Sequence, residues 1–145
     1  MKNHISKVMV ISLFLIFYGC AHSQVTVYRP LPPVTVDGER AWNILIETIK
    51  TFYKGVEYEN KEAGEIRSFV LITDKCWAGL LYGGYVPCKT ERLVAHVSSL
   101  SPFKVEIAVQ QHKGTPMTNY IKWIEAGNNF ARESEIYDIL IKKLM

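Results

Sequence analysis

The sequence predicts an α+β fold, in which an antiparallel sheet of four or five strands carries an N-terminal and a C-terminal helix on one face. Residues 38–54 and 130–144 each place apolar side chains at three- and four-residue steps, as amphipathic helices do. Residues 103–110 alternate apolar and polar side chains, which is typical of a strand with one buried face. Because both helices must bury their stripes and the sheet offers one apolar face, we expect them on the same side.

Residues 1–19 have the organisation of an export signal. Lys2 and Lys7 precede an uncharged run of 11 residues, 8–18. A basic start, an apolar stretch of about 7–15 residues and a small residue at the cleavage site characterise a secretory signal. A membrane-spanning helix needs about 20 apolar residues, so this run is too short to remain as a span. We therefore expect residues 1–19 to be removed as a lipoprotein signal peptide.

The end of this signal contains a candidate lipidation site. The sequence from Phe17 through Tyr18 and Gly19 to Cys20 resembles the bacterial lipobox, in which lipid is attached to the cysteine and cleavage occurs just before it. The resemblance implies a membrane anchor on Cys20. Ala21 follows it where aspartate would signal inner-membrane retention, which favours the periplasmic face of the outer membrane. The alternatives are an ordinary secreted protein with an incidental Cys20, or cleavage further on, near Ala21.

Residues 20–35 are interpreted as a tether between lipid and domain. Pro30, Pro32 and Pro33 favour an extended, semi-rigid spacer. The alternative is that the alternating segment 25–28 docks as an edge strand. The single folded domain is then expected over residues 36–145.

A first helix is predicted over residues 38–54. Asp37 is a favourable N-cap, and Glu39 places a carboxylate in the first turn, where the helix dipole favours it. Gly55 is expected to supply the left-handed residue that ends the helix. The apolar stripe comprises Trp42, Leu45, Ile49, Phe52 and Tyr53.

Period-two alternation predicts the strands. They are expected near 56–58, 65–73, 93–98 and 103–110, with a fifth strand at 119–125. Strand 65–73 is apolar on both faces near its end, which predicts a central position. In the fifth strand, Ile121 and Trp123 are expected to face inward.

A closing helix is predicted over residues 130–144. Gly127 and the two asparagines after it interrupt the chain and cap the helix, and Lys142 and Lys143 suit its C-terminal end. The expected stripe comprises Phe130, Ile136, Tyr137, Leu140 and Leu144.

The order αββββα after a lipobox and a stalk resembles the BamC-type lipoproteins over roughly residues 36–144. The first helix with a tryptophan, the turn NKEAGEI and the closing helix ending in leucines carry this resemblance. The resemblance implies a helix-grip-like domain and an adaptor role in the machinery that assembles outer-membrane β-barrels. That family commonly has two such domains, whereas this chain has one, and it offers no catalytic motif to carry over.

The composition argues against a nucleic-acid-binding protein. Removal of Lys2 and Lys7 with the signal leaves 15 basic against 14 acidic residues. A net charge of about +1 provides no electrostatic footprint for nucleic acid and no polybasic membrane patch. The remaining length fits one domain.

Two cysteines remain once Cys20 is assigned to the anchor. Cys76 and Cys88 flank a glycine-containing loop between two predicted strands, and export places them in an oxidising compartment. We expect them to form a disulfide. The alternative is a zinc site with His96 and His112, although these spacings match no familiar zinc module. By the strand alternation, His96 is expected on the polar face.

The loop between these cysteines is rich in large apolar residues. They are Trp77, Leu80, Leu81, Tyr82 and Tyr85. We expect the loop to fold back as a lid over the open end of the domain. The alternative is an aromatic contact surface for a protein partner or for lipid headgroups.

Motifs for catalysis, phosphate binding or a cofactor are absent from the sequence. The expected function is therefore not enzymatic, with no cofactor and no metal. We expect a lipid-anchored periplasmic adaptor that contacts the membrane through its lipid and binds an envelope protein. The alternative is a binder of a small apolar ligand or lipid between sheet and helices.

Overall fold

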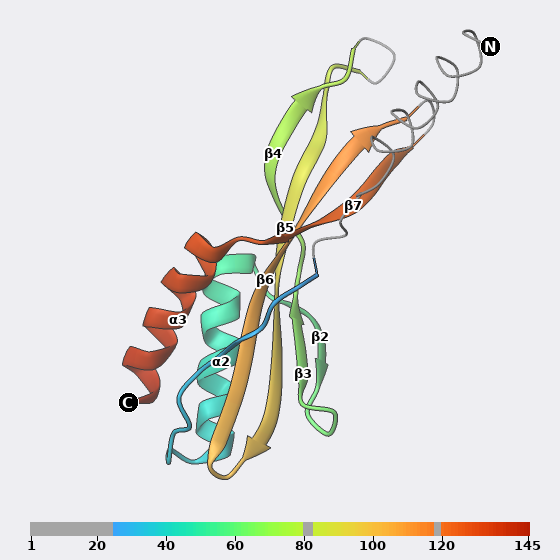
Figure 1. Cartoon of the computed structure of the whole chain (residues 1–145). Coiled ribbons are helices and arrows are strands. Elements are labelled where there is room, and N and C mark those ends of the chain that lie inside the picture. Colours follow the sequence, from blue (N-terminus) through green and yellow to red (C-terminus); the bar gives the residue numbers. More distant parts are fainter. Residues whose placement is uncertain (1–24, 80–82, 118–119) are drawn as a thin grey trace, which may run out of the picture.

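The computed structural model describes residues 25–79, 83–117 and 120–145, and it confirms the α+β class. An antiparallel sheet carries helices α2 (Gly38–Tyr53) and α3 (Phe130–Leu144) on one face (Figure 1). The Asp37 side chain accepts a hydrogen bond from the amide of Arg40, and the Asn129 side chain accepts one from the amide of Arg132. Capping by short polar side chains thus starts both helices close to the predicted residues.

In the described residues the sheet has more strands than predicted. They are β1 (Arg29–Pro30), β2 (Val56–Asn60), β3 (Glu65–Ser68), β4 (Leu71–Trp77), β5 (Tyr85–Leu100), β6 (Phe103–Pro116) and β7 (Ile121–Asn128). Strands β5 and β6 span 16 and 14 residues, so each has different neighbours along its length. At one end the order is β1-β6-β5-β3-β2, and at the other β4 pairs with β5 and β7 pairs with β6.

The core lies between the helices and the first of these two regions. Helix α2 contributes Leu45 and Ile49, and α3 contributes Ile136 and Leu140, all with at most 1% of their surface exposed. Facing them from the sheet are Leu93, Ala95, Val105, Ile107 and Val109. Side chains from the helices and from the sheet therefore pack together as the hydrophobic core.

Past the paired residues Lys89 and Lys113, strands β5 and β6 separate into two hairpins that project from the helix-covered body (Figure 1). We call residues 71–90 the first arm and residues 112–128 the second arm. The first arm pairs β4 with β5, and the second pairs β6 with β7. Both helices lie beside the body rather than the arms in Figure 1.

The predicted strand 65–73 is interrupted at Phe69 and Val70. Both β3 and β4 pair with β5, but Leu71 lies four positions after Arg67 while their partners on β5 are only three positions apart. The extra residue disrupts the ladder, and Phe69 and Val70 are about half exposed. The predicted central position is correct for β3 and wrong for β4, whose described neighbour is β5.

Three apolar residues expected in the core lie outside it. Trp123 and Phe130 are 40% and 62% exposed, and Ile121 is only partly buried. Trp123 and Ile121 pair with the end of β6 that extends past the helices, where neither helix can cover them.

Helix α2 ends one residue earlier than predicted. The left-handed residue after it is Lys54, and Gly55 follows at a positive φ as well.

The predicted tether differs from the structure over residues 29–34. Strand β1 pairs with β6, and the amides of Leu31 and Val34 donate to the carbonyls of Val105 and Phe103. Leu31 and Val34 are buried, so part of the Pro-rich segment packs against the domain. The alternative, an edge strand over residues 25–28, lies just before the observed edge strand β1. Across the described ranges, no helix combines the length and the apolar character that crossing a membrane requires.

Candidate functional site

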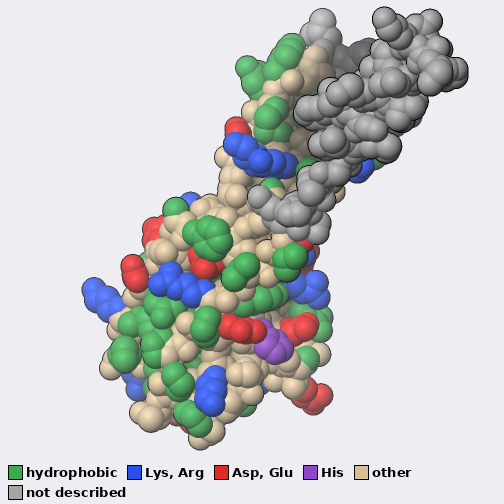
Figure 2. All heavy atoms as spheres, in the orientation of Figure 1, with side chains coloured by type: hydrophobic (Ala, Val, Ile, Leu, Met, Phe, Trp, Pro, Cys, Tyr) green, Lys and Arg blue, Asp and Glu red, His purple; other side chains and the backbone are tan. Residues whose placement is uncertain are grey.

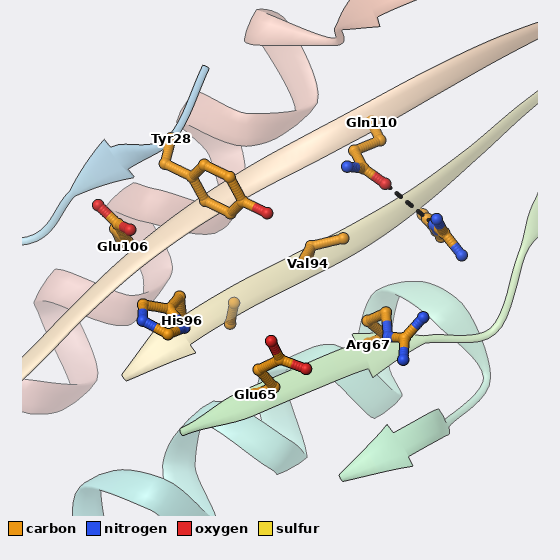
Figure 3. Close-up of a pocket in the computed structure, with 9 residues that line it drawn as sticks. Tyr28, Glu65, Arg67, Val94, His96, Glu106 and Gln110 are labelled. Carbon is orange, nitrogen blue, oxygen red and sulfur yellow. Dashed lines mark hydrogen bonds between the residues drawn. The ribbon is translucent and has the colours of Figure 1, made fainter. Parts of the chain in front are cut away.

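The face of the sheet opposite the helices carries an open polar groove of about 490 Å³ (Figure 3). Its walls come from the segment before β1 and from strands β3, β5 and β6. The groove is lined by Tyr28, Glu65, Arg67, Arg92, Val94, Ala95, His96, Glu106 and Gln110. Alternation explains its polarity, because the intervening residues of the same strands face the core.

At one end of the groove, His96 lies between two carboxylate side chains. On β3, Glu65 is the direct cross-strand partner of His96, and on β6, Glu106 is its partner on the other side. Directly opposed residues place their side chains on the same face of the sheet, as Figure 3 shows for these three. The predicted position of His96 on the polar face is therefore confirmed.

At the other end, two arginines lie on neighbouring strands. Arg92 donates from Nε to Oε1 of Gln110 at 3.0 Å, and the guanidinium of Arg67 lies 4.4 Å from the ring centre of Tyr58. Stacking on an aromatic ring orients an arginine without neutralising its charge. The groove thus has an acidic end and a basic end.

Tyr28 closes one side of the groove, with its ring extending over β6 (Figure 3). The segment before β1 is held by Thr26, which accepts a hydrogen bond from the Gln110 side chain at 3.1 Å. Burial raises the pKa of the Tyr28 hydroxyl above its usual range, and the charges of Glu106 and Glu65 raise it further. This hydroxyl therefore stays protonated at neutral pH and can donate a hydrogen bond into the groove.

The four formal charges of the groove have no ion-pair partner within residues 25–79, 83–117 and 120–145. The described ion pairs involve other carboxylates, and Glu65, Arg67, Arg92 and Glu106 take part in none of them. Such a surface can offer oriented charges of both signs to a second molecule. Its open, polar character suits a peptide or protein surface better than an apolar small molecule.

In the first arm, Cys76 and Cys88 form a disulfide, with their Cα atoms 5.5 Å apart. The predicted pairing is therefore confirmed. The two strands continue past the cysteines, so that Trp77 and Tyr85 are cross-strand partners with ring centres 5.3 Å apart. The disulfide fixes the strand pair that presents these two rings.

The predicted lid is wrong for the two aromatic residues that can be assessed. Trp77 and Tyr85 are 59% and 69% exposed, and the arm extends away from the body instead of folding over it (Figure 1). Leu80, Leu81 and Tyr82 lie outside the described residues, as does the predicted lipidation site Cys20. The alternative, an aromatic contact surface, stays a prediction.

The zinc alternative is contradicted by the disulfide. The sulfur atoms of Cys76 and Cys88 are bonded to each other, although Asp74 also lies within 4.8 Å of both. The two histidines are separated as well: His96 pairs with Glu106 and His112 with Thr90, six residues apart along β5, or about 20 Å. The sequence-predicted metal ligands are therefore not brought together.

His112 lies instead beside a second hollow of about 310 Å³ at the base of the arms. This hollow is also lined by Val70, Thr90, Arg92 and Trp123. Burial lowers the pKa of His112, and the nearby positive charge of Arg92 lowers it further. The imidazole is therefore neutral at neutral pH.

Two buried glutamates lie in the body where the arms leave it. Glu91, 1% exposed, accepts hydrogen bonds from Asn129 at 2.7 Å and Tyr53 at 3.4 Å, and Arg132 lies 3.4 Å away. Burial, and then the charge of Glu91, raise the pKa of Tyr53. This cluster connects β5, the end of α2 and the start of α3.

Glu133 has a parallel role one turn into α3. It is 2% exposed and accepts hydrogen bonds from the Asn128 side chain at 2.8 Å and from the amide of Val109 at 3.3 Å. Both buried carboxylates are satisfied by partners within the protein, so we assign them a structural role.

Neither the groove nor the two buried glutamates are indicated by the sequence pattern. The groove is formed by four separate segments of the chain. Within any single strand, its charged residues have the pattern of ordinary solvent-exposed positions. The alternation in 103–110 was the available signal, because it placed Glu106 on the face away from the helices.

No family model, curated protein or solved structure matches this chain.

Proposed function

We propose that this protein is a lipid-anchored periplasmic adaptor, which binds an envelope protein through its groove while its lipid holds it at the outer membrane. The lipobox-like sequence ending at Cys20 supports the anchor and the location. The BamC-type resemblance supports a role in envelope assembly or maintenance. The observation that carries the binding role is the set of four groove charges without ion pairs among the described residues.

The groove has the residue types of a protein interface. Tyrosine and arginine are enriched where proteins bind one another, and they dominate the binding energy there. Arg67 and Arg92 can each form paired hydrogen bonds with a carboxylate of a partner, while Glu65 and Glu106 can receive basic groups. The expected partner is therefore an exposed protein segment that carries charges of both signs.

The alternative function, binding of an apolar ligand between sheet and helices, has less support. That space is occupied by tightly buried side chains, among them Leu45, Ile107 and Leu140. A ligand there would have to displace packed core residues.

The absence of catalytic motifs in the sequence favours the non-enzymatic proposal.

The test is crosslinking in the native envelope, followed by purification of the lipidated protein and identification of its partners. The variant Arg67→Ala/Arg92→Ala should lose recovery of a specific partner, with binding weakened roughly thirtyfold, as for a loss of about 2 kcal/mol at an interface hot spot. The matched control is Arg40→Ala, which removes an exposed arginine from α2 on the opposite layer. Equal recovery of every partner by both variants would contradict the proposal.

A further inference from the structure

The two arms expose aromatic side chains, those of Trp77, Tyr85 and Tyr120 near the outer ends and that of Trp123 nearer the base. Trp77 and Tyr85 lie on the first arm, and Tyr120 and Trp123 lie on the second. Their exposed fractions range from 40% for Trp123 to 69% for Tyr85. The hydrophobic side chains at the end of the first arm are visible at the top of Figure 2. Trp77 and Tyr85 contact each other with their ring centres 5.3 Å apart, and together with Tyr120 and Trp123 they expose more aromatic surface than single scattered residues do.

In the second arm, the Trp123 side chain packs against Gly114, its partner on the neighbouring strand. A Cβ atom at this position would lie 2.9 Å from the Trp123 ring and 2.7 Å from Ile121. The absence of a side chain at Gly114 therefore leaves room for the Trp123 ring against β6. The disulfide of the first arm and this contact in the second arm each restrain a strand pair that carries an exposed tryptophan.

A short segment of chain connects the predicted lipid anchor to residues that contact the second arm. Thr26 and Val27 contact Glu125 and Asn128 at the base of the second arm. Val25 lies five positions after Cys20, so the two Cα atoms are at most roughly 18 Å apart. From Glu125 to Ile121, β7 rises by about 13 Å. A lipid on Cys20 therefore lies at most roughly 18 Å from Val25, a distance of the same order as the rise of the arm, about 13 Å.

We propose that the aromatic ends of both arms lie in the lipid–water interface of the membrane that holds Cys20. This inference rests on the proposed lipid anchor and adds a second, non-covalent contact with the same bilayer. Tryptophan and tyrosine are enriched at that depth because their rings are apolar and their polar atoms stay hydrated. The contact orients the groove, which lies on the body, away from the lipid and towards a periplasmic partner.

The charge of the arms fits an anionic membrane surface. Residues 71–90 and 112–128 contain four lysines, Lys75, Lys89, Lys113 and Lys122, against Asp74 and Glu125. A net charge of about +2 near the interface attracts acidic headgroups, whereas the mature protein as a whole is nearly neutral. A protein partner could also cover the aromatic residues, but the short reach of the anchor favours the lipid.

The test uses the full lipidated protein, reconstituted from detergent into phosphatidylethanolamine–phosphatidylglycerol vesicles that contain acyl chains brominated near the headgroup. Flotation with the vesicles reports the lipid anchor, and quenching of tryptophan fluorescence reports contact between the arms and the lipid. Trp42, 2% exposed in the core, should contribute an unquenched background. We expect quenching in the unmodified sequence, and its loss in Trp77→Phe/Trp123→Phe.

A matched control distinguishes an upright protein from one that lies on its side. In the Trp77→Phe/Trp123→Phe background, Arg40→Trp places an exposed indole near the opposite end of the body, since Gly38, two positions earlier on α2, packs against Leu100. Tyr85 and Leu100, at the two ends of β5, are about 50 Å apart. We expect no quenching of this indole.

The outcomes separate this inference from the proposed anchor. A protein that fails to float shows that the lipid anchor is absent, and both proposals then fail at that step. A protein that floats without quenching of Trp77 and Trp123 keeps its anchor and overturns the membrane contact of the arms. Equal quenching at the Arg40 position would overturn the upright orientation and with it the inference.

Discussion

At the scale of single residues, the junction between arms and body depends on buried polar groups that no local pattern identifies. Glu91 lies in the polar stretch KTER, which reads as solvated surface, yet it is nearly inaccessible. Its partners come from α2 and from the start of α3, 38 and 41 positions away. Burial of this carboxylate is tolerated because several donors compensate for its lost hydration.

The variant Glu91→Ala should lower the free energy of unfolding by about 3 kcal/mol or more, because it leaves Asn129 and Tyr53 without their acceptor and Arg132 without its buried partner. Urea denaturation measures this change. The matched control is Glu135→Ala, which removes the exposed partner of the same Arg132 and should change stability by at most about 0.5 kcal/mol. Similar losses in both variants would show that Glu91 has no special structural role.

At the scale of elements, the helices were predictable and the long strands only in part. Caps and stripes are local signals, so α2 and α3 begin and end within a residue of the predicted positions. Strands β5 and β6 extend past the predicted segments. Their outer halves are not covered by helices and show no clean alternation of apolar and polar residues, so the sequence pattern indicated only part of each strand. The break at Phe69 was not predictable, since it depends on the pairing register with β5.

The closing helix offers a direct check of which apolar residues form the core. Leu140→Ala should destabilise the protein by about 2–5 kcal/mol, as other large-to-small core changes do, because Leu140 is completely buried. Phe130→Ala, on the same helix, should stay within about 0.5 kcal/mol, because this ring is mostly exposed. Chemical denaturation of the two variants decides the matter, and a large loss at Phe130 would place it in the core after all.

The disulfide should stabilise its own arm more than the body. In Cys76→Ser/Cys88→Ser, we expect faster amide hydrogen exchange in 71–77 and 85–90 and unchanged exchange in 104–109, because the bridge closes a short loop within one hairpin. The control Lys89→Ala removes the exposed ion pair of the same arm with Asp74 and should leave exchange nearly unchanged. Faster exchange throughout the sheet would show that the arm and the body unfold together.

At the scale of the whole molecule, the sequence predicted the fold class and the disulfide but not the shape. The two arms arise because β5 and β6 are longer than the helices that cover them. The alternation pattern predicted shorter strands, so it did not indicate the arms. The groove combines residues from four segments, so only the three-dimensional pairing of β3, β5 and β6 brings Glu65, His96 and Glu106 together. Cys20, in contrast, is predicted from the sequence alone.

The central claim is that a lipid on Cys20 holds the protein at a membrane, and both proposals depend on it. The most direct measurement is the intact mass of the protein extracted from membranes with detergent. The account predicts loss of residues 1–19 and a gain that corresponds to a diacylglycerol and an N-linked acyl chain on Cys20. A soluble product that starts elsewhere, or an unmodified Cys20 at the mature N-terminus, would contradict it.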